Sequence, residues 1–214
     1  MFSKKVIINL QKKDDTIHIE PLGDIHTGHV GFIEDAYKER IKDIAKDDNR
    51  YTLFMGDQLD AINIYDKRYN PDAVVLHDID AQRQRWQDLT QPLIDEHLTR
   101  CEKIKFKQNM YNVKTENFDK IERTKFVDFL GAKSYISLDI RHKGKILGQW
   151  SIMAMHGSGG GQPETMLKQM KQNNYCDIFF CGHLHQKFYK AENVIDMDHK
   201  TGKIWQRDIH LIIR

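Results

Sequence analysis

Cysteine is scarce in this sequence, and its scarcity excludes one class of protein. The 214 residues include three cysteines, at positions 101, 176 and 181, and no CxxC pair. These are too few for the disulfide framework of a small secreted domain. The first residues, MFSKKVIINLQKK, also lack the apolar core and cleavage site of a signal peptide. We therefore expect a protein of the reducing cytoplasm.

Long apolar runs and a large net charge are lacking as well. Stretches such as IMAM at 152–155 are far shorter than the roughly 20 residues of a membrane-spanning helix, so no membrane partner is expected. The 33 basic and 31 acidic residues leave a formal charge of +2, which excludes a global polycation that would demand nucleic acid. Neither a repeat nor a low-complexity segment is present. The sequence predicts a single domain over residues 1–214.

Strands and helices alternate in the first quarter of the sequence. The apolar runs 5–10 and 16–22, with KKDD between them, predict a β-hairpin. Apolar residues at helical spacing in 32–48 indicate an amphipathic helix, and 51–57 is typical of a buried strand. Residues 17–57 therefore predict a βαβ unit with parallel strands.

The middle of the sequence is more polar and partly basic. Residues 61–103 begin with the loop NIYDKRYNPD and continue at helical spacing, in a helix that Pro92 is expected to kink or divide. We predict that this segment is a cap or a substrate-selecting insertion. Its cations predict either a solvated face or contacts with a phosphate backbone. They are Lys67, Arg68, Arg83, Arg85, Lys103, Lys105 and Lys107.

The remainder of the sequence is rich in strands. Strands are expected at 103–107, 134–140, 146–157, 176–183 and 203–214, and helices at 116–131 and 163–174. The fold class predicted from this pattern is α/β, a two-layered sandwich of mixed β-sheets flanked by helices.

Carboxylates and imidazoles gather at the C-terminal ends of the expected strands, where open α/β sheets bind their ligands. They are Asp24 and His26, Asp57 and Asp60, His156, and His183 and His185. Oxygen and nitrogen ligands without thiolates suit divalent metals such as Mn, Fe or Zn. Six of these side chains, two carboxylates and four imidazoles, exceed what one catalytic ion needs, so we predict two divalent ions bridged by a shared carboxylate.

The order of these clusters resembles the motifs of the calcineurin-like metallophosphoesterases. Four of the family's five motifs follow one another: DxH at 24–26, GDxxD at 56–60, an isolated histidine before glycine at 156, and GHxH at 182–185. The resemblance implies the sandwich fold of that family. It also implies hydrolysis of a phosphomonoester or phosphodiester through a dinuclear metal centre and a metal-bound hydroxide.

The resemblance implies a ligand set for each ion. One ion would be bound by Asp24, His26, Asp57 and His185, and the other by Asp57, Asn109, His156 and His183. Asp57 would then bridge the two ions.

The family's fifth motif, GNH, is absent from the sequence. The nearest stretch places Asn109 in the asparagine position and Met110 in the position of the family's catalytic histidine. A thioether cannot exchange a proton, and Asp60, which orients that histidine in the family, would lose its partner. General acid–base assistance is worth about 10²–10⁴-fold, so its loss predicts slow hydrolysis. The alternative proton carriers are His29, His77 and His97.

Other functions stay open beside hydrolysis of a nucleotide-type phosphodiester. One is a DNA nuclease of the same family whose basic middle segment grips the backbone. Another is a catalytically weakened metal-binding or scaffold protein. Cys181 fits a buried core residue better than a metal ligand. The glycine-rich stretch 157–161 lacks the GK[ST] ending of a P-loop, so we expect it to form a loop beside the metal site.

Overall fold

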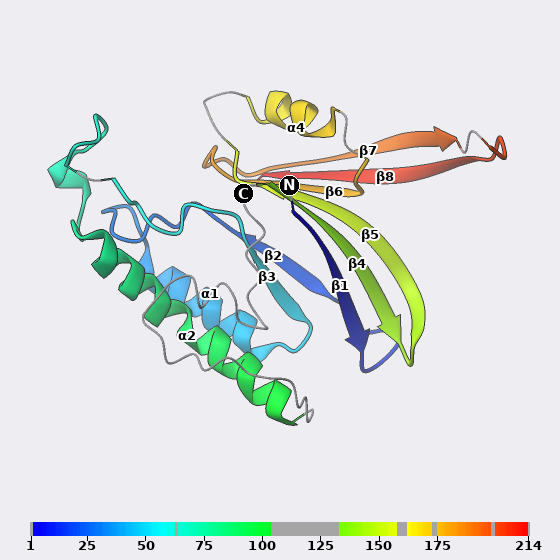
Figure 1. Cartoon of the computed structure of the whole chain (residues 1–214), viewed down its shortest axis with the longest axis horizontal. Coiled ribbons are helices and arrows are strands. Elements are labelled where there is room, and N and C mark those ends of the chain that lie inside the picture. The colour runs from blue at the N-terminus through cyan, green and yellow to red at the C-terminus, as the bar shows by residue number, and fades with distance from the viewer. Residues whose placement is uncertain are drawn as a thin grey trace.

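Two β-sheets pack face to face in this chain, and helices cover their outer faces (Figure 1). The computed structural model describes residues 2–62, 64–103, 133–157, 162–172, 175–197 and 200–213. The arrangement confirms the expected α/β class, with a central mixed sheet. None of the helices in these ranges has the length and apolar character needed to cross a membrane.

The larger sheet has six strands in the order β1-β4-β5-β6-β8-β7. The pairs β1 with β4, β5 with β6, and β6 with β8 are parallel, whereas β4 with β5 and β7 with β8 are antiparallel. The strands are β1 (Phe2–Leu10), β4 (Lys133–His142), β5 (Lys145–Met155), β6 (Ile178–Cys181), β7 (Phe188–Met197) and β8 (Ile204–Ile213).

The smaller sheet is the predicted βαβ unit. Its parallel strands, β2 (His18–Leu22) and β3 (Arg50–Phe54), are connected by α1 (Glu34–Lys46). Ile41 and Ile44 on the buried face of α1 are completely inaccessible to solvent. A parallel pair needs a crossover of this kind, because the chain must return from the end of the first strand to the opposite edge of the sheet, where the second strand begins.

The described residues contain three further helical segments. α2 (Ile79–Lys103) packs against α1, and the short η1 (Pro71–Ala73) precedes it. α4 (Pro163–Lys171) covers the outer face of the larger sheet near β6 and β8 (Figure 1).

Apolar side chains fill each interface between these layers. Ile8, Leu138 and Ile152 of the larger sheet meet Ile19 and Leu53 of the smaller one. On the other face of β2 and β3, Leu22 and Phe54 pack against Trp86 and Leu89 of α2 and against α1. Met153, Phe179 and Leu211 fill the space under α4. Burial of these side chains fixes the two sheets against one another.

The expected hairpin of residues 5–10 and 16–22 is wrong. β1 pairs with β4 in the larger sheet, while β2 pairs with β3 in the smaller sheet. The apolar faces of β1 and β2 both point into the core between the sheets. Each strand therefore buries its apolar side chains across that core rather than beside its sequence neighbour.

Two other expectations differ from the structure. Pro92 lies inside α2, which is continuous from Ile79 to Lys103, so of the two expected effects, a kink or a division, the division is wrong. The buried residues Leu89 and Leu93 on either side of Pro92 hold the helix against α1, which offsets the missing backbone hydrogen bond. β7 was not expected. It is stabilised by antiparallel pairing with β8 over ten residue pairs. The expected strand at 103–107 and helix at 116–131 lie almost wholly outside the described residues.

Asp139 connects three strands of the larger sheet. Its fully buried carboxylate accepts hydrogen bonds from Gln149 on β5 at 2.8 Å and from Arg141 on β4 at 2.8 Å, and it pairs with Lys5 on β1 at 3.0 Å. These three partners, Gln149 first, hold the pKa of Asp139 below its ordinary value.

We predict that this carboxylate contributes to acid sensitivity. A lowered pKa in the folded state means that the contribution is complete above about pH 4 and is lost as the pH falls further. Urea unfolding of the parent protein between pH 7 and pH 3 should show the free energy of unfolding falling more steeply than in Asp139→Asn. Equal slopes in the two proteins would contradict this role.

Candidate metal centre

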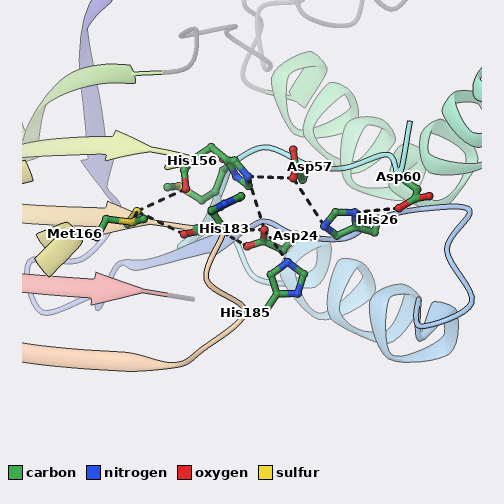
Figure 2. A network of polar contacts seen from close by, with 11 residues as sticks. Asp24, His26, Asp57, Asp60, His156, Met166, His183 and His185 are labelled. Carbon is green, nitrogen blue, oxygen red and sulfur yellow. Dashed lines mark hydrogen bonds and ion pairs between the residues drawn. The ribbon is translucent and has the colours of Figure 1, made fainter. Parts of the chain in front are cut away.

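The loops after four strands bring six of the predicted ligands, and Asp60, to one place (Figure 2). β2 and β3 of the smaller sheet and β5 and β6 of the larger sheet all end here, with their C-terminal ends adjacent. The loops carry, in strand order, Asp24 and His26, Asp57 and Asp60, His156, and His183 and His185.

The side chains form two groups of three. Within each group, one ligand atom of every residue lies within 4.8 Å of the others. The first group is Asp24, His26 and His185, and the second is Asp57, His156 and His183. The two groups contain the described residues of the two ligand sets that the family resemblance implies, except that Asp57 falls in the second group alone.

Asp57 lies between the two groups. Its Oδ2 is 3.1 Å from Nε2 of His156 and 3.8 Å from Nε2 of His26. Both of these nitrogens are buried and have no hydrogen-bond partner. A neutral imidazole lone pair beside a carboxylate oxygen is repulsive, so a cation between them would stabilise the pair. Asp57 thus lies within 4 Å of one histidine from each group.

The second ring nitrogen of each of these histidines is held in place. Nδ1 of His156 lies 3.1 Å from the backbone oxygen of Met55. Because a carbonyl oxygen only accepts, Nδ1 is the donor, and in the neutral ring the Nε2 lone pair is then available for a metal. Nδ1 of His26 lies 3.4 Å from Oδ1 of Asp60, whose side chain is 2% exposed. This carboxylate–histidine arrangement is typical of metal ligands.

Asp24 connects the two sheets through the backbone of His183. Both carboxylate oxygens of Asp24 accept from the His183 N–H, at 2.9 and 3.1 Å. The same carboxylate approaches Nε2 of His185 at 3.4 Å and Nε2 of His156 at 3.8 Å. The first group therefore depends on the position of the two sheets relative to one another.

The backbone of the site is strained. Asp24, His26, Asp57, His183 and His185 have φ between 49° and 74°, in the left-handed region. Such conformations cost about 1–3 kcal/mol each and cluster at functional sites. Gly56 has φ of 109°, and a Cβ placed there would lie 2.9 Å from the His156 ring. These conformations lower the stability of the chain and are held by the surrounding packing, as is usual at functional sites.

The centre is open to solvent on one side. The side chain of His185 is 60% exposed and that of Asp57 is 44% exposed, whereas that of Asp24 is 7% exposed. A ligand from solution would thus meet Asp57 and His185 first.

The remaining residues that the sequence singled out are not among the two ligand groups. Asn109 and Met110, the side chain of His97 and residues 158–161 lie outside the described residues. The His29 ring lies 6.5 Å from that of His26, and its Nδ1 accepts from the Gly31 N–H at 2.9 Å. His77 bonds through Nδ1 to Tyr69 Oη at 3.1 Å.

Cys181 belongs to the core under α4. Its thiol lies 2.9 Å from the sulfur of Met166. Burial, together with the charge of Asp24, raises the pKa of Cys181 to about 12. The thiol therefore remains protonated at neutral pH, which agrees with a structural cysteine rather than a ligand.

Sequence reasoning missed the backbone groups that hold the site. The Met55 carbonyl and the His183 N–H belong to peptide units that any residue would supply, so residue type gives no signal for them. The neighbouring glycines, Gly56 and Gly182, were the available signal, because a glycine beside a ligand indicates close backbone approach.

No family model, curated protein or solved structure matches this chain. The geometry of the centre and the order of its motifs therefore carry the functional argument.

Replacing Asp60 by asparagine should weaken binding of the first metal ion by about 10–100-fold, the usual effect of losing a partner that orients a ligand. The ring of His26 would lose its ionic partner while the ligand atoms stay unchanged. Calorimetric titration with Mn²⁺ measures the effect. Asp35→Asn, which changes an exposed carboxylate on α1, is the matched control. Equal affinities for both variants and the parent would show that Asp60 does not orient His26.

The variant Gly56→Ala should lose binding at the second group. The added methyl would displace the His156 ring, and alanine also disfavours the positive φ. The same titration should then show one fewer Mn²⁺ per chain. Gly144→Ala, whose positive-φ turn has open space around the glycine, is the matched control and should retain both ions. Full stoichiometry in Gly56→Ala would contradict the assignment of His156.

Proposed function

We propose that the chain is a metal-dependent phosphoesterase of the calcineurin-like type, with two divalent ions bound by the two ligand groups. The observation that carries the proposal is the division of the ligands into two triads that meet at Asp57. The ordered DxH, GDxxD, H and GHxH motifs support the same conclusion. Free cysteines at 176 and 181 accord with a cytoplasmic location.

The donor set fits such ions. Asp24 and Asp57 offer oxygen atoms, and the four histidines offer nitrogen atoms, a combination that suits Mn, Fe or Zn. Two orphaned Nε2 atoms, on His26 and His156, point at these carboxylates from buried positions. When bound, paired ions polarise a phosphate and lower the pKa of a coordinated water.

The residues of the chain divide the remaining work. Asp60 and the Met55 carbonyl hold the rings of His26 and His156, and the His183 N–H holds Asp24. These fixed positions lower the reorganisation needed when substrate binds. The exposed edge of the centre, at Asp57 and His185, is where a phosphate ester would enter.

The sequence departs from the family where a leaving group would receive its proton. Met110 stands where the family has histidine, so we propose that hydrolysis proceeds without that acid. Esters with stable leaving groups, such as nitrophenolate, need no such proton and should therefore be favoured.

Hydrolysis of bis(p-nitrophenyl) phosphate should depend on Mn²⁺ and fall to background in Asp57→Asn, since this variant weakens the shared ligand of both ions. Asp35→Asn should keep the parent rate. A parent that binds two ions without hydrolysing aryl phosphomonoesters, aryl phosphodiesters or DNA would instead be a metal-binding or scaffold protein. Cleavage of DNA that weakens steeply with salt would identify the nuclease.

A further inference from the structure

β7 forms one edge of the larger sheet. It is the last strand in the order β1-β4-β5-β6-β8-β7, and among the described residues it pairs with β8 alone. β6 pairs only with residues 210–213 of β8, so the rest of the β7–β8 ribbon extends beyond the neighbouring strands (Figure 1). A two-stranded ribbon is marginally stable by itself, and an open edge offers backbone donors and acceptors to another strand.

One face of this ribbon exposes apolar side chains. Alternate residues of β7 point to opposite faces, and the odd-numbered residues from Tyr189 to Met197 are all exposed. Ile195 is 71% exposed, and Ile204, which lies opposite Met197 on β8, is 64% exposed. Neighbouring apolar side chains that remain in water beside an open edge are typical of a surface that binds another chain.

The other face of the ribbon carries opposite charges at its two ends. Near the start of β7, Glu192 pairs with Lys190 at 3.3 Å and also with Lys171 of α4, so this group has one cation in excess. Near the end of β7, Arg207 pairs with Asp196 at 2.6 Å and also with a second carboxylate just before β6, so this group has one anion in excess. The strand is therefore positive at one end and negative at the other.

A second copy of β7 can pair with the first about a two-fold axis, with the strands antiparallel. The registers that use almost the whole strand are centred on Glu192 or on Asn193. A centre at Glu192 places this carboxylate opposite its own copy, which is unfavourable. A centre at Asn193 places Lys190 of each copy opposite Asp196 of the other. The charges of β7 thus select the register centred on Asn193.

The same register also joins the apolar faces of the two ribbons. Tyr189 of one copy would lie opposite Met197 of the other, and Ala191 opposite Ile195. Cross-strand apolar pairs of this kind stabilise a sheet. One register therefore satisfies both faces of the strand.

The opposite edge of the larger sheet lacks this complementarity. β1 contains Lys4 and Lys5 and no acidic residue, so two copies of β1 cannot form a pair of opposite charges. Lysines are typical of an edge that is protected from pairing with another chain. Self-association is therefore expected at β7 rather than at β1.

We propose that the protein forms a two-fold dimer in which β7 of one copy pairs antiparallel with β7 of the other, centred on Asn193. The two large sheets then continue into one another, with two Lys190–Asp196 pairs on one face and the apolar side chains on the other. The ligands of the metal centre take no part in this pairing, so the dimer does not depend on the phosphoesterase function.

Sedimentation equilibrium of the full chain over a range of concentrations measures the dissociation constant of the dimer. Lys190→Asp and Asp196→Lys should each raise it about 10–100-fold, because each variant meets its own copy with like charges. An equimolar mixture of the two variants should associate about as tightly as the parent, because every cross-strand pair then joins opposite charges. Lys145→Asp reverses a charge on β5, with β6 and β8 between it and β7, and should leave the dissociation constant unchanged.

The mixture distinguishes a lost contact from a lost fold, since two misfolded variants would not restore each other. A parent that stays monomeric at every concentration would overturn the dimer. A dimer that is equally tight in both variants would place the interface elsewhere and overturn the role of β7. Two weakened variants that fail to associate on mixing would contradict the pairing of positions 190 and 196.

Discussion

Carboxylate oxygens facing buried imidazole nitrogens that have no hydrogen-bond partner are the constraint on which this structure depends. Nε2 of His26 and of His156 both lie beside Asp57 without a hydrogen bond. A buried polar atom without a partner costs about 1–3 kcal/mol, and strained backbone adds a similar cost at each of five candidate ligands. A chain that retains such an arrangement gains something other than stability from it, and bound cations would relieve the repulsion directly.

The two-sheet architecture explains why these ligands come from distant parts of the sequence. Asp24 and Asp57 follow strands of the smaller sheet, while His156 and His183 follow strands of the larger one. Each group of three includes residues from both sheets, so neither sheet supplies a complete group by itself. The apolar core between the sheets and the bond from the His183 N–H to Asp24 set their relative position. Core packing therefore sets the positions of the candidate ligands.

Local sequence patterns predicted what depends on local periodicity. The unit β2-α1-β3 and the strands β5, β6 and β8 follow from apolar spacing, and the ligands follow from their places after those strands. Strand pairing does not follow from spacing, so the expected partner of β1 was wrong and β7 was missed. Asp60 was expected to lack a partner because Met110 stands at the histidine position, yet its carboxylate meets His26. A motif predicts which residues lie near one another, whereas the fold determines which of them are in contact.

The central claim is that two cations lie side by side between these ligands, and electron paramagnetic resonance of the Mn²⁺-loaded protein tests it most directly. Ions about 3.5–4 Å apart share a bridging ligand, so two equivalents of Mn²⁺ should give the spectrum of an exchange-coupled pair. Asp57→Asn should weaken that coupling. Two equivalents that give only the spectrum of isolated Mn²⁺, in the parent as in the variant, would contradict a shared centre.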